Sequence, residues 1–208
     1  MNTKEIIPEF TVDNKYTKNP IHITLDKKEQ WYMMGYYVRN GWLQSETCHD
    51  INFTILDYLN SDNTTHIYVG GSKTLQKYED EIMDKIGSVL PITFQMHNTE
   101  KFTVIGSYNN FPSDCCKNFT WYSILTEFGK DKCGKIIPEW VHDAPKEYIQ
   151  EFIDGYVKSD HCLITDSFDI AFSIQRLFIK LNKIYSITIT PELKKDNIKF
   201  SLYIHPYK

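Results

Sequence analysis

Two copies of one motif place an Asn or Asp side chain five residues after a glycine. The first copy contains Gly35 and Asn40, and the second contains Gly155 and Asp160. The glycines are 155 − 35 = 120 residues apart, so the two copies are in register. Asp160 is a position fit for a catalytic carboxylate, whereas Asn40 brings a neutral amide to the equivalent place. The spacing therefore predicts a paired site with one acid and one amide.

The repeat indicates a duplicated unit, because each copy could supply one helix to a shared interface. Glycine inside an apolar helix costs roughly 1 kcal/mol relative to alanine, so a packing reason is expected for Gly35 and Gly155. Close crossing of two helices at these glycines is such a reason. A chance match is the alternative, because this short spacing is common. Duplication predicts an N-terminal arm over residues 1–20, a first half over 21–130 and a second half over 131–208.

The elements that must position these motifs follow from periodicity and from the residues that stop helices. Helices are expected over Lys27–Asn40 with Gly41 as the stop, Ser72–Ile86, Phe119–Phe128 closed by Gly129, Pro145–Ser159 and Phe168–Leu181. Strands are expected over Ile51–Leu59, Thr65–Val69, Ile92–Met96, Phe102–Ile105, Leu163–Thr165, Tyr185–Thr190 and Lys199–His205. The predicted fold class is α+β, with two pseudo-symmetric αββαββα-type halves. The motif helices are expected to pack at the centre of the fold, and the antiparallel strands could form one surface.

Composition predicts an ordered, soluble, intracellular protein. No apolar run approaches the ~18 residues of a membrane-spanning helix, and the N-terminus lacks the layout of a signal peptide. Five cysteines without such a signal indicate free thiols in a reducing compartment. A zinc site from Cys115, Cys116 and Cys133 is the alternative to core thiols, although adjacent cysteines lack the usual Cys-x2-Cys ligand spacing.

The charge of the chain opposes strong nucleic-acid binding. The formal net charge is −4, the isoelectric point is near 6.0, and only Arg39 and Arg176 are arginines. Affinity for phosphate backbones depends on clustered basic residues. Usage that is rich in Lys, Asn and Ile but poor in Arg is typical of an AT-rich genome, which is compatible with an organelle, a mobile element or a large DNA virus.

The paired motif resembles that of the LAGLIDADG homing endonucleases, especially the subgroup found inside inteins, over roughly residues 22 to 190. The segment before the second motif is also similar, with Phe128-Gly129, then Lys135-Ile-Ile-Pro138, a short helix and a proline. The resemblance implies that the motif helices pack at a pseudo-twofold axis and that their final acidic residues bind divalent metal. It also implies two four-stranded, saddle-like sheets that straddle double-stranded DNA. The splicing blocks of an intein are absent from the sequence, which predicts a free-standing protein.

The same resemblance assigns roles to individual residues. Asp160 and Asn40 become metal ligands for Mg²⁺ or Mn²⁺, and Lys135, 160 − 135 = 25 residues before Asp160, becomes a cation near the scissile phosphates. Hydrolysis of a phosphodiester needs an activated water and neutralisation of developing charge, which a carboxylate-held metal supplies and a lysine can assist. Gly35 and Gly155 become the helix interface, while no particular DNA-binding residue is identified.

Three departures from the family pattern bear on catalysis. Asn40 carries no negative charge, and hard cations prefer carboxylates, so cleavage limited to one strand, or none, is expected. His161 stands where the family usually has glycine, and Arg39 puts a cation beside the vacant acid position. The simplest alternative makes Asp160 an exposed helix-end acid and Lys135 a solvated loop lysine.

These observations leave three functions open. The first is a monomeric DNA-binding protein with the endonuclease fold, whose cleavage is weakened, limited to nicking, or lost. The second is an active metal-dependent, site-specific DNA endonuclease that tolerates Asn40. The third is a protein-interaction module on the same fold, which the acidic isoelectric point favours.

Overall fold

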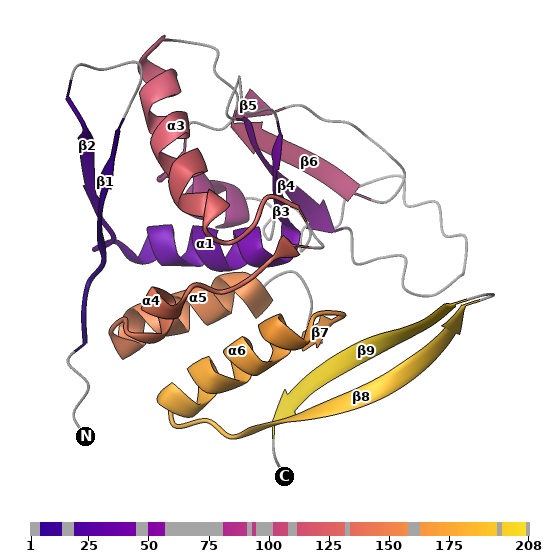
Figure 1. The fold of residues 1–208 in the computed structure, drawn as a ribbon. Coiled ribbons are helices and arrows are strands. Elements are labelled where there is room, and N and C mark those ends of the chain that lie inside the picture. Colours follow the sequence, from indigo (N-terminus) through magenta and orange to yellow (C-terminus); the bar gives the residue numbers. More distant parts are fainter. Residues whose placement is uncertain are drawn as a thin grey trace.

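The computed structural model describes residues 5–13, 19–44, 50–56, 81–90, 93–94, 102–107, 112–131, 134–157, 163–194 and 197–206, and for some of these only the backbone. Over this part the protein is mixed α+β, and its strands pair in an antiparallel sense (Figure 1). Several sequence predictions fall outside the described part. They concern the strand Thr65–Val69, most of the helix Ser72–Ile86, Asp160, His161 and the cysteine side chains.

The two motif helices lie side by side at the centre of the protein (Figure 1). They are α1 (Lys28–Asn40) and α5 (Lys146–Val157). Every residue of α1 from Gln30 to Val38 is buried. The middle of α1 is enclosed on all sides, as expected of a run, Trp31–Val38, that contains no charged residue.

The first sheet has the strand order β3-β4-β6-β5. Its strands are β3 (Gly41–Gln44), β4 (Asp50–Leu56), β5 (Thr93–Phe94) and β6 (Phe102–Ser107). The strand β3 was not predicted, because Gly41 was expected only to stop the helix. Gly41 does end α1, but its backbone is extended, with φ −98° and ψ 159°, so the chain enters β3 directly. The motif helix is therefore joined to the sheet without a loop.

The second sheet has the order β7-β9-β8. Its strands, β7 (Leu163–Thr165), β8 (Tyr185–Lys194) and β9 (Asn197–Pro206), confirm the three predicted here and extend two of them. The two sheets are separate in the described part. The first half runs α1, β3, β4, the helical residues 81–87, β5 and β6, and the second runs α5, β7, α6, β8 and β9, which is a shorter form of the same order. Helix α6 (Phe168–Lys180) packs on this sheet and buries Ile170, Ile174, Leu177 and Phe178.

A hairpin of β1 (Glu9–Val12) and β2 (Ile21–Thr24) precedes α1. The predicted arm thus contains a strand, and residue 20 lies inside the hairpin. The described residues also form the helices α3 (Pro112–Thr126), the short α4 (Glu139–His142) and the helical residues 81–87. Gly129 follows α3 with φ +93°, the left-handed backbone that favours glycine at a helix end. Within the described ranges, no helix is both long enough and apolar enough to cross a membrane.

Candidate active site at the ends of the motif helices

The crossing of α1 and α5 occurs at the two motif glycines, as the sequence predicted. A Cβ atom built on Gly35 would overlap the Phe152 carbonyl oxygen and lie 2.8 Å from its carbon. A Cβ atom on Gly155 would overlap the Tyr32 carbonyl oxygen and also lie 2.8 Å from its carbon. Only glycine allows two backbones to approach this closely.

The contacts at the crossing are reciprocal. Gly35 meets the residue three before Gly155, because 155 − 152 = 3, and Gly155 meets the residue three before Gly35, because 35 − 32 = 3. A contact in which each partner uses the same pair of positions is the mark of twofold symmetry. The 120-residue repeat of the sequence is therefore present in the packing of α1 against α5.

Asn40 is the last residue of α1 and is half-buried. Its Nδ2 atom is fully buried and has no hydrogen-bond partner among the described residues. Which end of the amide carries the nitrogen is decided by surrounding partners, so the group could present either atom. A buried polar atom without a partner at this helix end is expected where a ligand or another side chain contacts the amide.

A metal site is not complete in the described part of the chain. No group of three or more His, Cys, Asp or Glu side chains lies there in an arrangement that could hold an ion. Asn40 alone cannot hold a divalent cation, since Mg²⁺ requires six oxygen ligands, at least some of them carboxylates or waters. The structure thus describes Asn40 at the end of α1, and the ligand roles of both Asn40 and Asp160 stay predictions.

The Arg39 side chain makes contacts within the protein. Its Nη1 donates a hydrogen bond to the Ile164 carbonyl oxygen of β7, and its guanidinium carbon lies 5.5 Å from the centroid of the Tyr156 ring. Burial raises the pKa of the Tyr156 hydroxyl, and Arg39 acts in the opposite direction. Arg39 therefore connects the first motif helix to the second half.

Lys135 is buried, with 6% of its surface exposed, so it is not a solvated loop lysine. Its Nζ donates a hydrogen bond to the Gly129 carbonyl oxygen at 3.0 Å and lies 3.1 Å from the centroid of the Tyr37 ring. Burial lowers the pKa of this amine to about 6, although the negative charge of Asp131 acts to raise it. At neutral pH the amine is largely uncharged, and it points at the first motif helix.

The junction of α1 and β3 is held by contacts with Gly129, Lys130 and Lys135. The Tyr37 hydroxyl donates to the Gly129 carbonyl oxygen at 2.7 Å, and the Leu43 amide donates to the Lys130 carbonyl oxygen at 2.9 Å. Asn40 lies between these two attachment points along the chain. Tyr37 was not singled out from the sequence, because its partners lie about a hundred residues away and leave no local pattern.

Comparisons with known proteins give a structural likeness only. No family model matches the chain, and no curated protein matches it. A solved structure of I-DmoI in complex with DNA and Mn matches with a TM-score of 0.46 and 10% identity, covering 85% of this chain and 89% of that one. Structures of mesophilic variants of the homing endonuclease I-DmoI match with a TM-score of 0.45 and 10% identity, covering 85% and 88%. These values describe a loose similarity of backbone.

Proposed function

We propose that this protein is a divergent LAGLIDADG homing-endonuclease-like DNA-binding protein. Its cleavage activity is weakened, limited to nicking, or lost, because Asn40 takes the place of the first catalytic acid. The observation that supports this function is the reciprocal crossing at Gly35 and Gly155. It means that the duplicated motif is a structural pair, and that positions 40 and 160 follow equivalent points of the two helices.

The retained acid would act with a divalent cation. Asp160 and the Asn40 amide oxygen would hold Mg²⁺ or Mn²⁺, and the ion would lower the pKa of a water and neutralise charge on the phosphate. Asn40 would orient its side of the site without adding charge. Lys135 would serve through its contacts with Tyr37 and Gly129, which hold the end of α1 that carries Asn40.

A plasmid relaxation assay tests the proposed chemistry. Native protein is incubated with supercoiled plasmid and Mg²⁺ or Mn²⁺, beside Asp160→Ala and the control Asp169→Ala, which removes an exposed acid on α6. Nicked product that Asp160→Ala abolishes and Asp169→Ala preserves supports a surviving metal-dependent nuclease. Product that persists in Asp160→Ala contradicts the role assigned to Asp160. Absence of product with either metal leaves DNA binding as the function to test.

The salt dependence of binding tests the DNA partner separately from cleavage. Fluorescence anisotropy with a random-sequence duplex pool measures affinity at several salt concentrations. Contacts to phosphates release counterions, so affinity should fall steeply and linearly on logarithmic axes. If binding is undetectable at low salt, where the electrostatic attraction is strongest, DNA is not the partner.

A further inference from the structure

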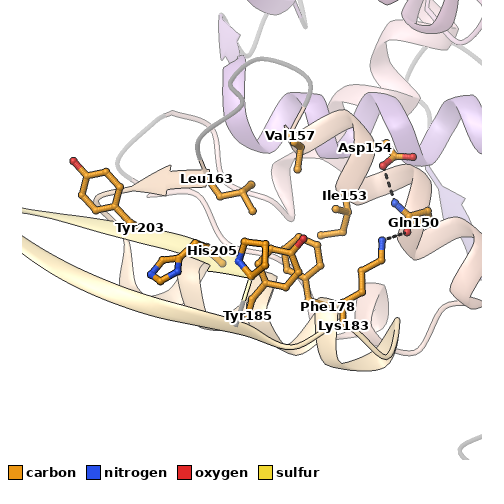
Figure 2. A pocket seen from close by; sticks show the side chains of 12 residues that line it. Gln150, Ile153, Asp154, Val157, Leu163, Phe178, Lys183, Tyr185, Tyr203 and His205 are labelled. Carbon is orange, nitrogen blue, oxygen red and sulfur yellow. Dashed lines mark hydrogen bonds between the residues drawn. The ribbon is translucent and has the colours of Figure 1, made fainter. Parts of the chain in front are cut away.

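A pocket of about 440 Å³ opens between α5, α6 and the second sheet (Figure 2). Its walls are largely apolar and aromatic, and include Phe178 of α6, Tyr185 of β8 and Leu163 of β7. Four residues of α5 line it: Gln150, Ile153, Asp154 and Val157. Their spacing of three, one and three residues places them on one face of the helix.

The repeat of the chain shows how the first half treats the same helix face. Subtracting 120 from each of those four numbers gives the equivalent positions of α1. All four equivalents are fully or almost fully buried: Gln30 (7% exposed), Met33 (0%), Met34 (0%) and Tyr37 (0%). In the second half, Asp154 is exposed and Gln150 and Val157 are partly exposed. One face of the duplicated helix is thus covered in α1 and open in α5.

Part of this cover in the first half, at Tyr37, is provided by α3 and the residues that follow it. Helix α3 is drawn on the side of α1 away from α5 (Figure 1). Tyr122 of α3 is close enough to Tyr37 to contribute, after burial, to the raised pKa of that hydroxyl. The Tyr37 hydroxyl also donates to Gly129, three residues beyond the end of α3. At Tyr37, this face of a motif helix is therefore met by a helix and the residues that directly follow it.

Charged residues at the rim of the pocket indicate which charge a bound helix should carry. Asp154 stands where α1 has Met34, and among the described residues its carboxylate has one hydrogen-bond partner, Gln150 Nε2 at 2.7 Å. Lys183 Nζ donates to the other end of that amide, Gln150 Oε1, at 2.9 Å (Figure 2). A bound helix is therefore favoured when it places a basic residue beside Asp154 and disfavoured when it places one beside Lys183. This difference selects one orientation of the helix in the pocket.

We propose that this pocket is a docking site for an amphipathic helix of a partner protein, whose apolar side chains fill the pocket and whose basic residue faces Asp154. Binding of this kind uses side chains at successive turns of one helix face. The site does not depend on the proposed DNA binding, and each can be present without the other.

The test uses peptides with the sequence of the chain's own covering helix. Two labelled peptides span residues 112–129, and both carry C115S and C116S. The basic peptide also carries E127K. The acidic peptide instead carries K117E. Fluorescence anisotropy measures their affinity for the native protein, for Asp154→Arg and for the control Asp169→Arg. We expect the native protein and the control to bind the basic peptide about fivefold more tightly than the acidic one, as for a partly exposed ion pair. Asp154→Arg should reverse that order.

Hydrogen exchange of the full chain locates the bound peptide. Added protection should appear in α5 and β9 and not in α1. Absence of saturable binding by either peptide overturns the proposal, as does a preference that Asp154→Arg leaves unchanged or protection confined to another surface. A stable dimer by light scattering whose interface protects α5 and β9 also overturns it, because a second copy would then occupy the pocket.

Discussion

At Gly155 the backbone of α5 rests on the Tyr32 carbonyl group of α1, with 2.8 Å between the carbonyl carbon and the place that a Cβ would take. The same relationship holds between Gly35 and Phe152. Side chains of ordinary size cannot be inserted at such a contact without separating the helices. The two glycines therefore set the distance between the halves of the protein.

Gly155→Ala should destabilise the protein strongly. The added methyl group would meet backbone atoms, which cannot turn aside as a flexible side chain can, and overpacking of this kind typically costs about 1–3 kcal/mol or more. Gly35→Ala should cost a similar amount, because the contact is reciprocal. Urea unfolding followed by circular dichroism measures both changes.

Gly134→Ala is the matched control for this experiment. A Cβ there would have one neighbour, Asp131 Oδ1, at 3.6 Å, which is an ordinary contact. The free energy of unfolding should change by less than about 1 kcal/mol. Equal losses for Gly134→Ala and Gly155→Ala would mean that the close crossing is not what makes Gly155 necessary.

Asn40→Asp should increase metal-dependent cleavage of DNA. The substitution restores a carboxylate at the end of α1, where hard cations prefer charged oxygen ligands. In the plasmid assay, nicked product should give way to linear product if the site is otherwise intact. Asn40→Ala serves as the comparison, since it removes the amide without adding charge. Equal activity of Asn40→Asp and Asn40→Ala would contradict a ligand role for this position.

Lys135→Met should remove a pH dependence of stability. The pKa of Lys135 is lowered from its ordinary value of 10.5 to about 6 in the folded protein. Between these values the unfolded chain binds a proton that the folded chain does not, so native stability rises with pH across this window, by up to about 1.4 kcal/mol per unit. Urea unfolding at about pH 7 and pH 9 should show native protein gaining stability relative to Lys135→Met. An unchanged difference would mean that Lys135 keeps its proton when folded.

His142 should make the protein sensitive to acid. This side chain is buried, its Nε2 has no hydrogen-bond partner among the described residues, and burial, followed by the charge of Arg176, lowers its pKa. Below the ordinary pKa of histidine the unfolded chain gains a proton first, so stability falls as the pH falls through that window. His142→Phe should lose less stability than native protein between about pH 8 and pH 5. Parallel pH profiles of the two proteins would refute this assignment.

The glycine crossing could be predicted from sequence because glycine in an apolar helix needs a packing reason. The predicted strand Leu163–Thr165 matches β7, and the predicted helix Phe168–Leu181 matches α6 to within one residue, since both depend on local periodicity. The earlier start of α3 at Pro112 had a signal that was not used: proline is favoured in the first turn of a helix.

Other features were out of reach because they depend on distant parts of the chain. The strands β2 and β3 have four residues each, too few for a clear alternation, and they form by pairing with β1 and β4. The burial of Lys135 depends on the Tyr37 ring and the Gly129 carbonyl, which meet only in the folded protein. The function proposed for Asp160 remains a prediction from its motif.

The enclosure of α1 has a consequence for how such proteins diverge. Selection for a stable fold acts on the buried residues from Gln30 to Val38 whether or not the protein cleaves DNA. Selection for catalysis acts on the helix end, at Asn40. A lineage can therefore keep a recognisable motif whether or not it keeps the chemistry, so the motif of α1 is by itself evidence of packing and not of activity.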